Sequence, residues 1–129
     1  MNPIMKLFIN STGDLGHGTQ ESYTKPKLVK ALEAENIKRI TAGSKFNIVV
    51  NEKGQVFHWG NGEYGVFGDG DNKNHQVPFR NEYFKYLEEE ENISMKKVKS
   101  CSTFSIALMT DNHLYGWGSN HAGQMGIKN

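Results

Sequence analysis

Features that would cross-link the chain or anchor it in a membrane are scarce in this sequence. Its 129 residues contain one cysteine, Cys101, and three prolines. A single cysteine cannot form an internal disulfide, and it excludes a zinc site that needs several cysteines. No apolar run approaches the roughly 18 residues of a membrane span, and the start of the chain is too weakly charged for a signal or transit peptide. We therefore expect a soluble, intracellular protein, cytoplasmic by default, with no direct membrane insertion.

An excess of charge of one sign is also lacking. Lysine and arginine number 15 against 14 aspartate and glutamate, a net charge of +1. Proteins dedicated to nucleic acids normally carry a basic surplus that replaces phosphate counterions, so we expect no nucleic-acid partner. The 14 glycines and 14 aromatic residues (7 Phe, 5 Tyr, 2 Trp) favour short elements that are joined by tight turns.

An internal repeat organises the chain. A shift of 58 residues aligns 46–50 with 104–108 and 56–60 with 114–118, and both copies of the second segment end in Trp-Gly. Such self-similarity indicates a repeat architecture. A Gly-x-x-Gly motif also recurs, at 13–16, 65–68 and 123–126.

Side chains with a period of two predict β-strands inside each repeat. Gly54 and Asn112 occupy equivalent positions between two such segments, and both residue types tolerate positive φ, so we expect hairpin turns there. Trp59 and Trp117 lie one repeat apart and are predicted to be core residues of adjacent units. The predicted strands are 37–41, 46–50, 55–59, 95–99, 104–109 and 113–117.

The repeated residues resemble the regulator of chromosome condensation family. The resemblance is carried by 56–60, 65–68 and 117–126, and also by the Gly-x-x-Gly segment near the start and the Ala-Gly pair at 42–43. It extends from Asn10 to Ile127. The resemblance implies an all-β fold of antiparallel, four-stranded β-propeller blades, of which a complete propeller has about seven.

The length of the repeat sets the number of blades. A unit of 52 to 58 residues leaves room for about two blades and a leading fragment. We assign 1–129 to a partial β-propeller, with the end of one repeat at 1–18, a second repeat at 19–70 and a third at 71–129. About three repeats are needed for stability, and exposed blade edges aggregate. We therefore expect a fragment of a longer protein, or a remnant held by partners, that is unstable alone.

Local motifs for cofactors and metals are outweighed by the repeat. Residues 60–65 spell Gly-x-Gly-x-x-Gly, but no helix follows to hold a pyrophosphate, so a repeat turn is the better interpretation. Residues 69–74 hint at a calcium loop but place Lys73 where an oxygen ligand is required. The five histidines show no metal-ligand spacing, and Cys101 is expected to be a buried thiol. We assign no catalytic, cofactor-binding or metal-binding residue.

An insertion at 81–92 interrupts the third repeat with six extra residues. Insertions in repeat arrays often lie on the binding face, and aromatic residues are common interface anchors. The alternative is a short amphipathic turn that covers its own blade, with solvated glutamates. The candidate partner-binding residues are Tyr83, Phe84, Tyr86, Leu87, Glu88, Glu89, Glu90 and Glu91.

Two functions remain open for this sequence. The first is a non-enzymatic protein–protein interaction module that scaffolds a larger, multi-subunit assembly. The second, implied by the resemblance, is part of a guanine-nucleotide exchange factor for a small GTPase. No residue matches an exchange surface, and a net charge of +1 does not support chromatin binding. We therefore prefer the interaction module, which needs no cofactor.

Overall fold

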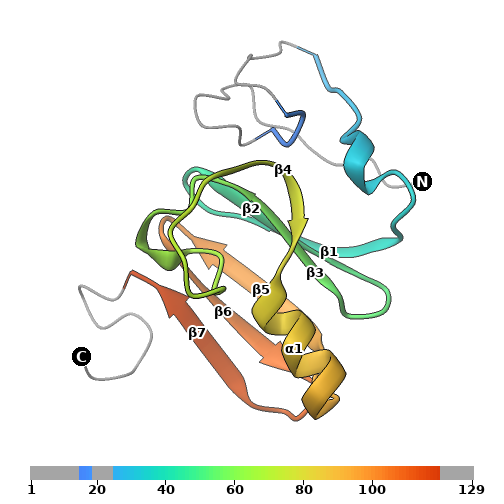
Figure 1. Ribbon diagram of the computed structural model, residues 1–129, viewed down its shortest axis with the longest axis vertical. Helices are drawn as coiled ribbons and strands as arrows, with labels where there is room; N and C mark the ends of the chain where they lie inside the picture. Colours follow the sequence, from blue (N-terminus) through green and yellow to red (C-terminus); the bar gives the residue numbers. More distant parts are fainter. Residues whose placement is uncertain (1–14, 19–24, 120–129) are drawn as a thin grey trace.

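Two antiparallel sheets and one helix make up the computed structural model, which describes residues 15–18 and 25–119 (Figure 1). The four strands of the first sheet lie in chain order, as do the three described strands of the second. A 3-10 turn η1 (Lys30–Leu32) precedes the first sheet, and η2 (Glu63–Gly65) follows its third strand. The strands are β1 (Ile37–Ala42), β2 (Phe46–Asn51), β3 (Val56–Gly60), β4 (His75–Arg80), β5 (Met95–Cys101), β6 (Phe104–Met109) and β7 (Leu114–Gly118), and the helix is α1 (Glu82–Glu91).

The two predicted hairpins are confirmed. Strand β2 pairs antiparallel with β3, and β6 pairs antiparallel with β7. Gly54 and Asn112 adopt positive φ angles of 81° and 66° at the two turns, as expected. The side chain of Asn51 also holds the first turn, because its Oδ1 accepts hydrogen bonds from the backbone N–H groups of Lys53 and Gln55 at 3.0 and 2.9 Å.

Helix α1 and strand β4 were missed by the strand pattern. The helix begins because the Asn81 side chain accepts a hydrogen bond from the backbone N–H of Phe84 at 2.9 Å, and it ends at Asn92 in the left-handed conformation. Residues 82–91 contain no glycine, proline or β-branched residue that would oppose a helix. Strand β4 contains Pro78 and lies at the edge of its sheet, where a missing N–H is tolerated.

The main hydrophobic core lies between the two sheets. Apolar side chains of β2 and β3 meet side chains of β5 and β6, and α1 adds two more. A second cluster packs Trp59 and Val49 on the opposite face of the first sheet against Val29 and Leu32. Strand β2 is therefore buried on both faces. The core members are Phe46, Ile48, Val50, Val56, Val66, Phe67, Phe84, Leu87, Met95, Val98, Ala107 and Met109.

A tryptophan contact joins the two sheets. The indole Nε1–H of Trp117 on β7 donates to the backbone carbonyl of Val66 at 2.8 Å. Gly68 has a φ of +69°, and a Cβ there would lie 3.0 Å from Cδ1 of Trp117. The relation recurs one unit earlier, since a Cβ on Gly16 would lie 2.8 Å from Nε1 of Trp59. The last glycine of the Gly-x-x-Gly motif thus makes room for the tryptophan of the following unit.

Burial was predicted for the two tryptophans and for Cys101, and the structure confirms it for the tryptophans only. Trp59 is fully buried, and Trp117 is partly buried against the core. The expectation of a buried Cys101 is wrong, because this last residue of β5 is exposed. The Gly-x-x-Gly copy at 123–126 and the first half of the copy at 13–16 lie outside the described residues.

Within the described part of the chain, no helix is long and apolar enough to span a membrane.

Substituting Gly68 tests the tryptophan contact, with Gly70 as the matched control. Gly70 also has a positive φ, +84°, but a Cβ there would have no neighbour within 4 Å. Gly70→Ala should lower the free energy of unfolding by about 1–2 kcal/mol, the cost of a left-handed alanine. Gly68→Ala should cost at least about 1 kcal/mol more, because its methyl group meets the indole ring. Equal losses in denaturant unfolding of the full chain would show that the close approach is unimportant.

Candidate functional site

The outward side of α1 carries four of the predicted partner-binding residues. Tyr83 and Tyr86 are 43% and 51% exposed, and Glu89 and Glu90 are also exposed. Tyr83, Tyr86 and Glu90 share one stripe of the helix, since they follow each other at spacings of three and four residues. We call Tyr83, Tyr86, Glu89 and Glu90 the α1 face. Figure 1 shows the helix between β4 and β5, beside the second sheet.

Phe84 and Leu87 do not belong to this surface, which corrects the sequence assignment. Both are buried in the core between the sheets, at 5% and 6% exposure. The ring of Phe84 lies 5.2 Å from that of Trp117, measured between centroids. They face inward together because residues three positions apart lie on one side of a helix, and this side adjoins the one that carries the tyrosines, since the Tyr83 and Phe84 rings are 5.5 Å apart. Their role is to attach α1 to the second sheet.

Glu88 is also held within the chain. Its Oε2 lies 2.6 Å from Nη2 of Arg80 on β4, and its Oε1 accepts a hydrogen bond of 3.4 Å from the side chain of Gln55. Both members of the ion pair are partly buried, at 29% and 28% side-chain exposure. Glu88 therefore ties α1 to the first sheet, whereas Glu91 remains exposed at the end of the helix.

The C-terminal turn of α1 is acidic, which is electrostatically unfavourable. Cations stabilise the C-terminus of a helix and anions destabilise it, typically by about 0.3–1 kcal/mol each. No basic residue lies in the last turn of α1. The Arg80 pair compensates Glu88 alone, so Glu89, Glu90 and Glu91 keep their charge exposed at this end.

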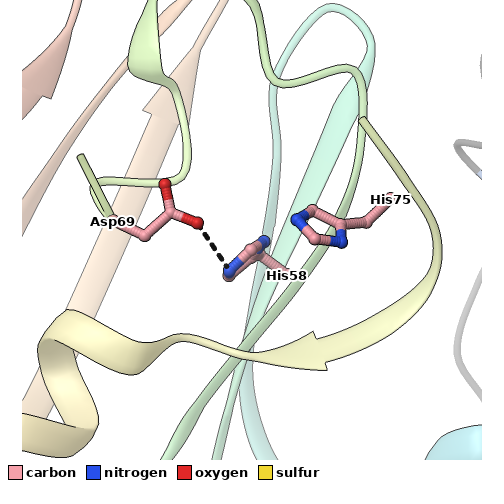
Figure 2. A group of neighbouring side chains, drawn as sticks. All are labelled: His58, Asp69 and His75. Carbon is pink, nitrogen blue, oxygen red and sulfur yellow. Dashed lines mark ion pairs between the residues drawn. The ribbon is translucent and has the colours of Figure 1, made fainter. Parts of the chain in front are cut away.

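A second cluster brings together three residues that the sequence analysis left apart. His58 on β3, Asp69 in the loop after η2 and His75 at the start of β4 each offer a ligand atom, and these atoms lie within 4.8 Å of one another. Figure 2 shows His58 between the Asp69 carboxylate and the His75 ring, with His58 Nε2 3.7 Å from Asp69 Oδ2. The arrangement follows from the return of the chain, because β4 pairs with β3 and places His75 opposite Gly60.

His58 is held as a neutral imidazole. It is fully buried and stacks on Phe67, with ring centroids 4.1 Å apart. Burial lowers the pKa of His58 to about 3, an effect that His75 increases and the negative charge of Asp71 opposes. Burial also raises the pKa of Asp69 above its usual value. Among the described residues, neither ring nitrogen of His58 has a hydrogen-bond partner.

No motif spacing pointed to this cluster, but the repeat carried a signal. A shift of 58 aligns His58 with Gly116 and Asp69 with Ile127, so the two copies differ at both positions. His58 and Asp69 therefore occur in one copy of the repeat and are replaced in the other. The histidines show no metal-ligand spacing along the sequence, and the three residues come together through the pairing of β3 with β4.

The buried His58 predicts a loss of stability in acid. The unfolded chain takes up a proton on this histidine near pH 6.5, whereas the folded chain resists protonation down to about pH 3. The unfolded state thus binds more protons between these values, and the free energy of unfolding should fall as the pH is lowered, by on the order of 4 kcal/mol in total. The raised pKa of Asp69 acts in the opposite direction and offsets part of the loss at the acid end.

Unfolding of the full chain at a series of pH values, with EDTA present, measures this dependence. His58→Phe keeps an aromatic ring on Phe67 and should flatten the profile between pH 6.5 and 4. His113→Phe is the control, since His113 is an exposed residue beside Asp111. It should leave the profile between pH 6.5 and 4 unchanged, because the His113 side chain only helps to lower the pKa of Asp111, which acts below this range. An unchanged profile in His58→Phe would show that another group causes the acid loss.

Comparison with known proteins shows what the repeat is. The regulator of chromosome condensation (RCC1) repeat matches residues 10–50 and 53–108, and a second description of that repeat matches 37–66 and 96–124. The human E3 ubiquitin-protein ligase HERC2 is 34% identical over 116 residues, which cover 88% of this chain and 2% of that protein. The human X-linked retinitis pigmentosa GTPase regulator is 34% identical over 132 residues, covering 99% of this chain and 12% of that protein.

A solved structure supports the same fold. Prp20p from Saccharomyces cerevisiae superposes with a TM-score of 0.70 at 24% identity, over 86% of this chain and 27% of that one. The chain thus spans only a small part of each of these proteins. The two sheets are blades of the propeller type that the sequence predicted. Because the RCC1 repeat matches most of the described strands and more than half of the sequence, the chain belongs to the regulator of chromosome condensation (RCC1) repeat family.

Proposed function

We propose that this protein is a non-enzymatic protein–protein interaction module whose propeller blades scaffold a larger assembly. The α1 face carries this proposal. It displays Tyr83 and Tyr86 on a helix that is fixed to both sheets, by Phe84 on one side and by the Arg80–Glu88 pair on the other. Tyrosines on a rigid support make good interface anchors because little conformational entropy is lost when they bind.

The charge of the α1 face indicates the chemistry of the partner. Glu89 and Glu90 of this face, and Glu91 beside it, stand at the end of the helix where negative charge is least favourable. A partner with a basic surface would relieve this repulsion on binding, and long-range attraction would accelerate the encounter. We therefore propose a protein partner that offers lysine or arginine side chains around an apolar pocket for the tyrosines.

A second surface supports the role as part of a larger scaffold. Ile106 on β6 and Leu114 on β7 are 41% and 73% exposed, whereas their equivalents one repeat earlier, Ile48 and Val56, are buried by the second sheet. Together with Leu108 they line a largely apolar hollow. By the symmetry of the repeat, we propose that a further blade covers this face as the second sheet covers the first.

Guanine-nucleotide exchange is the second candidate function. One relative is named as a GTPase regulator, and Prp20p is described by its binding properties to Gsp1p and histones. Exchange factors act through surface contacts. The α1 face, or the end of the sheets farthest from α1, would therefore serve as the surface that contacts the GTPase. Faster release of a fluorescent GDP analogue from a small GTPase, with the full chain added, would favour this function over simple scaffolding.

Substitution of the two tyrosines tests the interaction surface. A photo-crosslinking residue at position 86 of the full chain first identifies the partner in cells. Tyr83→Ala and Tyr86→Ala should each weaken binding of that partner by about 2 kcal/mol, roughly 30-fold, while the midpoint of unfolding changes little. Isothermal titration and thermal melts measure the two effects separately.

Two variants serve as controls for this experiment. Tyr64→Ala removes a tyrosine that is 53% exposed on η2, away from α1, and should leave binding intact. Phe84→Ala removes a buried ring and should cost about 3–5 kcal/mol of stability. If the Tyr83 and Tyr86 variants lose stability and keep binding, the helix only covers its own blade.

If a further blade covers β6, a charged side chain at position 106 should destabilise the protein. Ile48→Glu should strongly destabilise the full chain, by at least about 3 kcal/mol, because it buries an unpaired carboxylate between the sheets. If a further blade covers β6, Ile106→Glu should cost nearly as much. A cost of less than about 0.5 kcal/mol, typical of exposed surface positions, would show in denaturant unfolding that this face stays in water.

A further inference from the structure

We propose that His58, Asp69 and His75 form a binding site for a divalent transition-metal ion, and that zinc is the ion that this donor set fits best. Two imidazoles and one carboxylate are the ligands that zinc takes in three-residue sites, with a fourth position left for water. Calcium and magnesium prefer sites made of oxygen atoms alone. The site is separate from the α1 face.

The positions of the ligand atoms require only a modest movement. Zinc bonds of 2.0–2.2 Å place tetrahedral ligands about 3.3 Å apart. His58 Nε2 and Asp69 Oδ2 are already 3.7 Å apart, and all three ligand atoms lie within 4.8 Å of one another. His58 is fixed on a central strand, whereas the other two ligands come from the loop 61–74 and from the first residue after it. Closure therefore needs a shift of this loop by about an ångström or two.

The buried imidazole of His58 points to a missing partner. A polar group that is buried without a hydrogen bond costs about 1–3 kcal/mol. His58 is fully buried, and within the described residues neither of its ring nitrogens is satisfied. Stacking on Phe67 explains why an aromatic ring lies here, but phenylalanine would stack as well without this cost. A metal ion on Nε2 gives the nitrogen a function that stacking does not.

The loop 61–74 also orients the carboxylate of Asp69. Asp69 Oδ1 accepts a hydrogen bond of 3.2 Å from the backbone N–H of Asp71, which leaves Oδ2 directed at His58 (Figure 2). Such outer contacts fix the orientation of metal ligands. Asp69 is the anionic member of the ligand set, and a divalent cation bound to it would be stabilised by the charge of its carboxylate.

Metal binding would strengthen the joint between the blades. The loop 61–74 carries the Val66 carbonyl that accepts the Trp117 hydrogen bond, and it carries Gly68 beneath the indole. An ion that binds His58 on β3 and Asp69 in this loop would hold the loop against its own blade. We therefore expect zinc to raise the unfolding temperature of the full chain, because the ion binds the folded state preferentially.

Zinc titration of the full chain, stripped with EDTA and dialysed, tests the site. Competition against a chromophoric chelator should give one zinc ion per chain, and elemental analysis should confirm the ratio. His58→Phe, His75→Phe and Asp69→Asn should each weaken zinc binding by at least about 10-fold, as expected when a ligand is lost. The two phenylalanines keep the ring stacking on Phe67 and Phe79, and circular dichroism checks that each variant folds.

The control is another pair of a histidine and a carboxylate. His113 Nδ1 lies 3.1 Å from Asp111 Oδ2 on the surface, so His113→Phe should leave zinc binding unchanged. If His58→Phe fails to fold, the loop variants His75→Phe and Asp69→Asn decide the question alone. The proposal is overturned if the wild type binds less than half an equivalent of zinc, if His113→Phe weakens binding as much as the cluster variants do, or if calcium raises the unfolding temperature as zinc does.

Discussion

The fit of Trp117 over Gly68 determines how the two blades meet. The indole reaches back across the junction, donates its hydrogen to the Val66 carbonyl, and lies where any side chain at Gly68 would stand. Trp117 packs against the core that the apolar side chains of β2 and β5 share. A backbone hydrogen bond also joins the ends of the two sheets, from Ser44 N–H to the Ser102 carbonyl at 2.8 Å. The last glycine of the Gly-x-x-Gly motif is thus required by the packing of the tryptophan against it.

Helix α1 is stabilised by the side that packs against the sheets, whereas its other side is exposed. A single helix of this length is marginal in water, so it depends on its contacts with the sheets. Phe84 and Leu87 supply buried apolar area, and the Arg80–Glu88 pair adds a partly buried link to the first sheet. These contacts leave Tyr86 exposed, and Tyr83 exposed apart from an edge contact with the Phe84 ring at 5.5 Å. A side chain that can be changed without loss of stability is one on which a binding function can be built.

The sequence predicted the parts of the fold in which the two copies agree. The hairpin pairs, the positive φ of Gly54 and Asn112 and the burial of Trp59 all follow from aligned residues. Helix α1 has only the short 3-10 turn η1 at the equivalent place in the other copy, and its capping by Asn81 was hidden by the interpretation as a loop. The His58 cluster depends on the pairing of β4 with β3, a strand that was not predicted, and so its three members could not be placed together.

Both candidate sites lie where the repeat is broken. A residue that every blade needs, such as the tryptophan of each unit, is constrained by packing and has little freedom to acquire another role. His58 occupies a position that is glycine in the following unit, and α1 fills an insertion. Neither change is required to build a blade, and the buried histidine even opposes folding at low pH. Positions at which one unit departs from the other at a cost in stability are therefore those at which a repeat protein can carry a function of its own.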